Sequence, residues 1–188
     1  MEETIKIALA GEGGQGVQSV AGIMVEAAND EGREALYIPN FGVEQRGGVS
    51  VAYCQISDEK VGSPKFQYAD LVIALSDRAV RRTRQYANEN TLYIYDSSIK
   101  EVEKDLPQNA KKVIGIPALE TAKKELHPRV FNIIIMGAAI EATKIIGMEQ
   151  AKKAIEKKLG YKFAQKPELR ELNYKALERG AELLRGGL

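Results

Sequence analysis

The stretch IKIALAGEGGQGV, residues 5–17, decides how this chain begins to fold. Its first half, Ile5 to Ala10, is a short apolar run of the kind that forms a buried strand. A glycine cluster follows directly, made of Gly11, Gly13, Gly14 and Gly16. Apolar residues then recur at helical spacing from Val17 to Asn29. The stretch therefore predicts a strand, a tight turn and a helix.

Outward from this unit, strand and helix patterns alternate along the chain. Further strands are predicted at Ala35–Ile38, Val49–Ile56, Leu71–Leu75, Leu92–Tyr95 and Val113–Ile116. Further helices are predicted at Ser76–Asn88, Pro117–Leu126, Phe131–Ile146, Glu149–Leu159 and Pro167–Leu184. Short β-branched strands without polar residues are typical of parallel sheets. We predict an α/β fold with a mostly parallel sheet, helices on both faces and a C-terminal helical cap.

Length and composition narrow the class of protein. The length of 188 residues predicts one domain, 1–188, in which residues 147–188 form a helical tail. The composition, with 44% hydrophobic and 28% charged residues, argues against disorder. The net charge of +1 gives no electrostatic reason to expect nucleic acid or a membrane surface as a partner. The acidic start and the short apolar stretch Val130–Ile140 predict a cytoplasmic protein. The single cysteine, Cys54, cannot form an internal disulfide or hold an iron–sulfur cluster alone.

The near-neutral total hides an uneven distribution of charge. From Lys144 to Leu188 there are 11 basic and 6 acidic residues, so the tail carries +5 and the preceding residues carry −4. Lysine and glutamate alternate in the tail, which favours a solvated helical face over a docking surface. A docking role for the tail stays open from the residues alone.

The glycine cluster has the composition of an anion-binding turn. Glycines allow positive φ and close approach of a ligand, and the N-terminus of the following helix offers free N–H groups. A dinucleotide site would need an acidic residue at the end of the next strand, where Ile38-Pro39-Asn40 stands. A Walker A loop would need Lys and then Ser or Thr after Gly16, where Val17-Gln18 stands. Nicotinamide binding is thus disfavoured and a P-loop is excluded, while a packing turn without a ligand stays the alternative.

A second loop, Asn40 to Gly48, leaves the carboxyl end of the next strand. Ligands of open α/β sheets bind at this edge, which is also the edge of the glycine turn. Arg46 could present its planar guanidinium to a carboxylate or phosphate, or it could form a local ion pair with Glu44. The residues alone leave both interpretations open.

Taken together, these segments resemble a known family. Gly13-Gly14-Gln15-Gly16-Val17 and Phe41-Gly42-Val43-Glu44-Gln45-Arg46-Gly47-Gly48 are similar to the gamma subunit of the 2-oxoacid:ferredoxin oxidoreductases. Later segments continue the resemblance: Ile56–Val61 with Ser63-Pro64, Ala69–Leu75, Asp96-Ser97-Ser98, and Asn132 with Met136-Gly137-Ala138. It covers about residues 5 to 146 in register.

The resemblance implies that this chain is one subunit of a multi-subunit enzyme. Such enzymes oxidatively decarboxylate a 2-oxoacid on thiamine diphosphate, pass electrons through iron–sulfur clusters to ferredoxin and transfer the acyl group to coenzyme A. This chain has no Gly-Asp-Gly motif for magnesium and thiamine diphosphate, and it has one cysteine. The thiamine diphosphate, magnesium and clusters are therefore expected on alpha and beta partner subunits, with a ferredoxin-like delta subunit left open.

We hypothesise that this chain forms the coenzyme A side of the shared active site. The expected binding residues are Gly11, Gly13, Gly14, Gln15, Gly16, Phe41, Glu44, Arg46, Gly47 and Gly48; no catalytic residue and no metal ligand is predicted in the chain. Gly47-Gly48 and Ser57-Asp58-Glu59 resemble the 2-oxoglutarate type most. Pyruvate, indolepyruvate and branched-chain oxoacid enzymes stay open, as does a stand-alone nucleotide-binding module.

Overall fold

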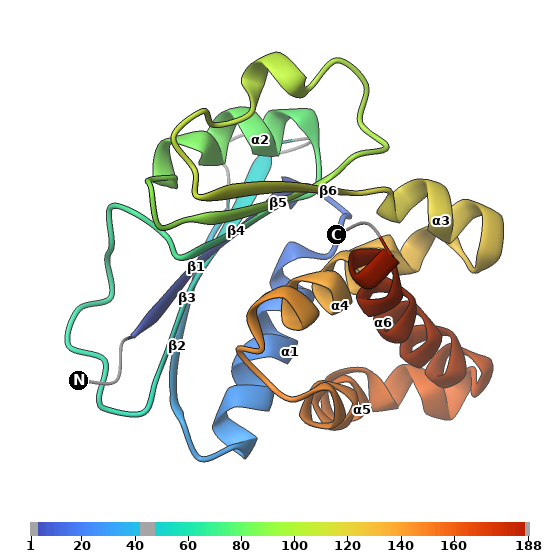
Figure 1. The fold of residues 1–188 in the computed structure, drawn as a ribbon. Coiled ribbons are helices and arrows are strands. Elements are labelled where there is room, and N and C mark those ends of the chain that lie inside the picture. Colours follow the sequence, from blue (N-terminus) through green and yellow to red (C-terminus); the bar gives the residue numbers. More distant parts are fainter. Residues whose placement is uncertain (1–3, 42–47, 187–188) are drawn as a thin grey trace.

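In the computed structural model, which describes residues 4–41 and 48–186, a six-stranded sheet lies between layers of helices (Figure 1). The strands are β1 (Ile5–Glu12), β2 (Glu34–Asn40), β3 (Val49–Ser57), β4 (Leu71–Ala74), β5 (Leu92–Asp96) and β6 (Lys112–Ile116). The helices are α1 (Val17–Asp30), α2 (Asp77–Thr83), α3 (Ala118–Glu125), α4 (Phe131–Thr143), α5 (Met148–Gln165) and α6 (Glu168–Gly186).

The sheet is mixed but mostly parallel, as predicted. Its order is β2-β3-β1-β4-β5-β6, and β1, β4, β5 and β6 run parallel to one another. The strand β3 is antiparallel to both β1 and β2. Glu12 at the end of β1 pairs with Val49, and Asn40 at the end of β2 pairs with Val51. The two strand ends therefore flank the start of β3, which confirms that the turn after β1 and the segment after β2 leave the same edge.

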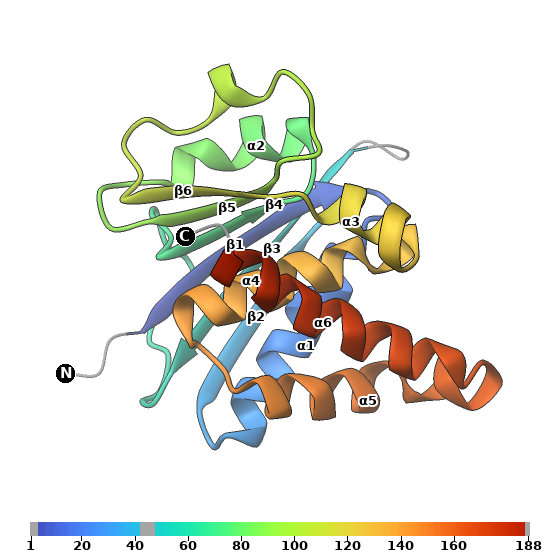
Figure 2. The same ribbon diagram turned by 45° about the vertical axis from the view of Figure 1, so that its right-hand side comes forward.

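Helices cover both faces of the sheet, which confirms the predicted layers. Figure 2 shows α5 and α6 on the same side of the sheet as α1 and α4, whereas α2 lies on the other side. The first ten residues of α4, Phe131 to Ile140, are all buried. Ala151 and Ile155 of α5 and Leu177 of α6 belong to the same buried cluster as Leu9 of β1. The helical tail thus completes the core on this face of the sheet.

Two glycines let α4 and α6 cross at backbone contact. A methyl group on Gly137 of α4 would overlap the carbonyl oxygen of Leu177 in α6. A methyl group on Gly180 of α6 would likewise overlap the carbonyl oxygen of Ile134 in α4. The glycine side of α4 therefore packs closely against α6.

Several predicted boundaries were wrong, and the helix predicted to reach Ile146 ends at Thr143. The helix predicted to stop at Leu159 continues through Gly160 to Gln165, because the next turn buries Phe163, which is 2% exposed. The helix predicted to reach Asn88 ends at Thr83 and gives way to a 3-10 turn. The strand predicted to end at Ile38 continues through Pro39 to Asn40, because β2 is an edge strand and tolerates the missing N–H of proline.

Part of the positive charge in the tail is paired with acidic side chains of the preceding helices. Lys157 of α5 contacts Glu26 of α1 at 3.2 Å and Asp30 of α1 at 2.5 Å. The Lys157 and Lys158 ammonium groups hydrogen-bond Glu26 and hold the pKa of its carboxyl below the ordinary value. These pairs join the tail to α1, so this part of its charge serves the fold. No helix in the described part of the chain is long and apolar enough to cross a membrane.

Cys54 lies in the middle of β3 and is 1% exposed, so it packs as a small buried apolar residue. Burial raises the pKa of its thiol to about 12. Because the thiolate is the reactive form, and an exposed thiol has a pKa near 8.5, we expect iodoacetamide at pH 8 to label the folded chain at least about 1000-fold more slowly than the urea-unfolded chain. Mass spectrometry of the labelled chain measures both rates. Equal rates would contradict the burial of this thiol.

Candidate functional site

The turn between β1 and α1 is closed by a single side chain, that of Gln15. Its Oε1 accepts a hydrogen bond from the backbone N–H of Glu12 at 2.6 Å, and its Nε2 donates to the carbonyl oxygen of Leu75 at 3.2 Å. Gln15 was predicted to contact a ligand. In the fold it ties the glycine turn to the end of β4.

The four glycines of the turn serve different purposes. A methyl group on Gly11 would come within 2.8 Å of Gln15 and Val17, so packing requires glycine there. Gly14 and Gly16 have φ values of 87° and 78°, which side chains rarely adopt. Gly13 is exposed, has no described atom within 4 Å of a built methyl group, and does not have positive φ. Within the described part of the chain, neither packing nor backbone conformation explains glycine at position 13.

The N-terminus of α1 opens directly onto this turn. Gly16 occupies the cap position, no described side chain caps the helix, and the first turn contains no acidic residue. The first N–H groups of an α-helix have no partner within the helix, and they carry a positive partial charge. The turn therefore presents hydrogen-bond donors without a negative side chain from the helix itself, as an anion site requires.

Side chains of three elements hold this helix end against the sheet. Gln18 of α1 donates through Nε2 to the Ser50 hydroxyl of β3 at 2.6 Å. The Tyr37 hydroxyl of β2 donates to Oε1 of Gln18. These contacts place the first turn of α1 beside the start of β3.

The second predicted loop is described only at its ends. Phe41 is 70% exposed and Gly48 is half-buried, and both adjoin the sheet edge that carries the glycine turn. Glu44, Arg46 and Gly47, predicted to bind beside them, lie outside the described residues.

Asn132 was not among the predicted binding residues, although the fold brings it to the glycine turn. It is the second residue of α4, and its side chain lies against Gly16. It is 8% exposed and is the one polar side chain in the apolar first ten residues of that helix. That isolated polarity was the available signal, because nothing in the local pattern relates position 132 to the glycine turn.

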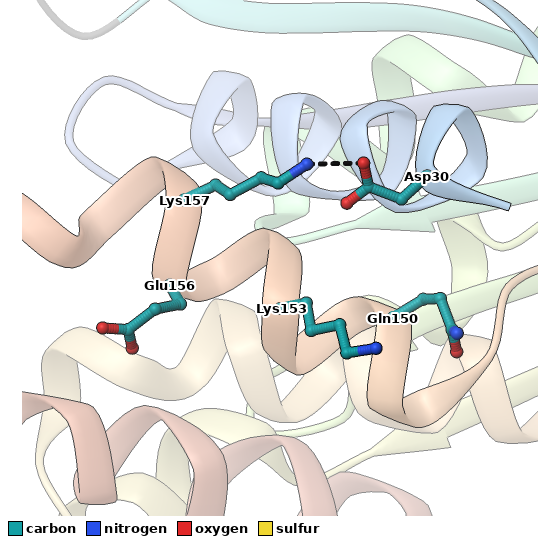
Figure 3. Close-up of a pocket in the computed structure, with 5 residues that line it drawn as sticks. All are labelled: Asp30, Gln150, Lys153, Glu156 and Lys157. Atoms are coloured by element: carbon teal, nitrogen blue, oxygen red, sulfur yellow. Dashed lines mark hydrogen bonds and ion pairs between the residues drawn. The ribbon is translucent and has the colours of Figure 1, made fainter.

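Two hollows lie elsewhere in the described part of the chain. One, of about 510 Å³, lies between α1 and α5 (Figure 3). Lys157 points toward Asp30 across it, and the other lining residues, Gln150, Lys153 and Glu156, come from α5. The other, of about 610 Å³, lies at the opposite edge of the sheet and includes Lys6, Gln55 and Asp70. Neither contains a glycine of the turn. In the described part of the chain, no three His, Cys, Asp or Glu side chains are grouped as a metal site.

Comparisons with known proteins agree over nearly the whole chain. Residues 6–183 match the sequence model described as pyruvate ferredoxin/flavodoxin oxidoreductase. Ketoisovalerate oxidoreductase subunit VorA of Methanothermobacter thermautotrophicus is 32% identical over 181 residues, which cover 96% of this chain and 36% of VorA. 2-Oxoglutarate synthase subunit KorC of the same organism is 31% identical over 188 residues, which cover 97% of this chain and 96% of KorC.

A solved structure has the same fold. It is the 2-oxoglutarate:ferredoxin oxidoreductase of Magnetococcus marinus with 2-oxoglutarate, coenzyme A and succinyl-CoA bound. The TM-score is 0.88 at 24% identity, over 99% of this chain and 32% of that chain. This chain thus spans about a third of VorA and of the Magnetococcus chain, and almost the full length of KorC.

Proposed function

The chain belongs to the gamma-subunit family of the pyruvate ferredoxin/flavodoxin oxidoreductases, and we propose that it is the gamma component of an enzyme that oxidatively decarboxylates a 2-oxoacid to an acyl-CoA. The match to KorC along almost its full length supports the role of a separate subunit. VorA and the Magnetococcus chain are about three times as long as the part that matches, which supports the proposal that this chain acts together with other parts of the same enzyme.

The residues of this chain do not fit the redox groups of that reaction. An iron–sulfur cluster needs several thiolates, and the lone Cys54 is buried in β3 with its thiol held in the neutral form. In this proposal, alpha and beta subunits carry thiamine diphosphate, magnesium and the clusters, with or without a ferredoxin-like delta subunit. The gamma chain binds coenzyme A and contacts the other subunits in the assembled enzyme.

We assign this chain the coenzyme A side of the active site, and the observation that carries the assignment is Gly13. A methyl group at this position would meet no atom of residues 4–41 or 48–186, so packing in the described part of the chain does not explain the glycine. A bare backbone beside an uncapped helix N-terminus suits the close approach of a phosphate group. Coenzyme A carries three phosphates, and the Magnetococcus enzyme is a case in which coenzyme A is bound to such an enzyme.

The other residues of the proposed site have unequal roles. Gly14 and Gly16 shape the turn, Gly11 packs beneath it, and Gln15 holds it closed. In the second loop, the guanidinium of Arg46 would bind a phosphate or carboxylate, flanked by Glu44, Gly47, Gly48 and the exposed Phe41 ring.

Gly13→Ala tests this assignment in the assembled enzyme. We expect the free energy of unfolding of the chain to change by less than about 0.5 kcal/mol, because the added methyl meets no described atom. The dissociation constant for coenzyme A should rise about tenfold, because the methyl group excludes the ligand. Isothermal titration calorimetry measures the affinity, and urea unfolding of the chain measures the stability.

Gly62→Ala is the matched control. Gly62 is exposed, has no described atom within 4 Å of a built methyl group and does not have positive φ. It should change neither the stability nor the affinity. An unchanged coenzyme A affinity in Gly13→Ala, with the complex intact by size-exclusion chromatography, would overturn the assignment.

For the oxoacid we propose 2-oxoglutarate, on the basis of Gly47-Gly48 after Arg46 and the full-length match to KorC. A branched-chain oxoacid is the second candidate, because VorA is similar at the same level of identity. Pyruvate and indolepyruvate have weaker support, and nothing in the comparisons favours a stand-alone nucleotide-binding module. Turnover of the assembled enzyme with each oxoacid distinguishes these substrates.

A further inference from the structure

One side chain of α1, that of Gln18, connects the helix to two strands at the edge of the sheet. Its Nε2 donates to the hydroxyl oxygen of Ser50 in β3 at 2.6 Å. Its Oε1 accepts a hydrogen bond from the hydroxyl group of Tyr37 in β2. The two ends of this amide are therefore bound to different strands, and a rotation of the amide would break both contacts.

The two strand residues lie close to the glycine turn in the register of the sheet. Ser50 pairs with Gly11, where the turn leaves β1. Tyr37 pairs with Cys54, and both belong to the apolar cluster on the face of the sheet that α1 covers. Gln18 itself is the second residue of α1. The network thus fixes the beginning of the helix directly to the sheet.

A glycine-rich turn by itself is a weak support for a helix end. Gly14 and Gly16 have positive φ, and glycine backbone adopts many conformations at similar energy. Gln15 closes the turn, but its two contacts are with Glu12 and Leu75 and not with the helix. Donors that bind a ligand have to be held within about 0.5 Å of their productive positions. The contacts of Gln18 supply this support for the first N–H groups of α1.

We propose that Gln18 is a positioning residue of the coenzyme A site, which acts through Ser50 and Tyr37 to hold the first turn of α1 where its N–H groups meet a phosphate. This inference rests on the proposed function. Gln18 does not have to touch the ligand, because both ends of its amide are bound within the chain. Donors that are already in place bind more tightly, because the ligand does not have to order them.

Gln18→Met in the assembled enzyme tests this role. Methionine has a similar length and shape but makes neither hydrogen bond. We expect the dissociation constant for coenzyme A to rise about fivefold by isothermal titration calorimetry, because the donors are no longer held in place. The kcat at saturating coenzyme A and the KM for the oxoacid should stay the same. A merely structural role would lower the stability of the chain and leave the coenzyme A affinity unchanged.

Variants of the two partners show whether the effect passes through the network. Ser50→Ala and Tyr37→Phe each remove one contact of Gln18, and each should raise the dissociation constant for coenzyme A about twofold. Adding Ser50→Ala to Gln18→Met should cause no further rise, because the contact is already lost. If Gln18→Met does not fold, the two partner variants decide the question.

Tyr53→Phe is the matched control for Tyr37→Phe. Tyr53 lies in β3, and its hydroxyl group is hydrogen-bonded to that of Tyr86 at 2.7 Å. Both tyrosines pack against the apolar cluster that contains Ala79 and Val80 of α2, on the opposite face of the sheet from α1. This variant removes a hydroxyl contact of the same kind, and it should lower the stability of the chain while the coenzyme A affinity stays unchanged.

The outcomes separate this inference from the function on which it rests. An unchanged coenzyme A affinity in folded Gln18→Met, or an equal loss of affinity in Tyr53→Phe, overturns the positioning role. If Gly13→Ala still weakens coenzyme A binding in that case, the coenzyme A site stands without this network. If the wild-type enzyme does not bind coenzyme A, or if Gly13→Ala has no effect, the proposed function itself fails.

Discussion

Replacing Gly180 with alanine should lower the free energy of unfolding by about 3 kcal/mol, because the added methyl forces two helices apart. The methyl would overlap the carbonyl oxygen of Ile134 and come within 2.9 Å of the backbone nitrogen of Ala138. Both atoms belong to the backbone of α4, so no side-chain rotation relieves the clash. Urea unfolding followed by circular dichroism measures the loss.

Gly160→Ala is the matched control, because Gly160 is also a helical glycine. The nearest atom to a methyl on Gly160 is Oε1 of Glu156 at 3.9 Å, which is ordinary contact. Alanine is a better helix former, so this variant should be more stable by about 0.5 to 1 kcal/mol. If both variants shifted the urea midpoint equally, α4 and α6 would not cross at backbone contact.

The second large effect is expected at Asp96, at the end of β5. Its side chain is 1% exposed, and its Oδ1 accepts from the N–H groups of Ser98 at 3.0 Å and Ala118 at 3.1 Å. Its Oδ2 accepts from Leu119 at 3.2 Å, so the carboxylate caps the N-terminus of α3. Burial raises the pKa of this carboxyl, and the hydrogen bonds oppose that shift. Asp96→Ala leaves these backbone donors unpaired, and thermal unfolding should show a loss of about 3 kcal/mol.

Asp77→Ala serves as the comparison for Asp96. Asp77 pairs with Arg81 at 2.6 Å, but both side chains are nearly half exposed. Solvent screens such a pair, so its removal should cost no more than about 1 kcal/mol. Similar losses at the two positions would contradict a capping role for Asp96.

Much of the fold could be predicted because its signals are local. The apolar run Ile5–Ala10, the glycine cluster and the helical spacing after Val17 act within a few residues of one another. The helix predicted to end at Leu159 was wrong for the same reason, because the prediction used only the local signal of Gly160. A helical glycine costs about 1 kcal/mol, and the burial of Phe163 one turn later outweighs that cost.

The site was predicted less completely than the fold. The glycine turn and its edge of the sheet were expected from the residues, and the described strand ends confirm the edge. The intramolecular role of Gln15 was not expected, because its partner Leu75 lies 60 residues later. Asn132 was noticed only as part of a resemblance, since its relation to Gly16 exists only in the folded chain.

The order of residues was enough to establish the strand–turn–helix unit, the α/β class and the absence of cysteines for a cluster, because each depends on short-range periodicity or on composition. Tertiary packing alone decided that β3 runs against its neighbours, that α6 crosses α4 at glycine, and that Gly11 packs while Gly13 stays bare. The periodicity of apolar residues predicts which face of a helix or strand each side chain lies on. Which atoms it then meets depends on segments far apart in the chain, and these come together only when the core closes.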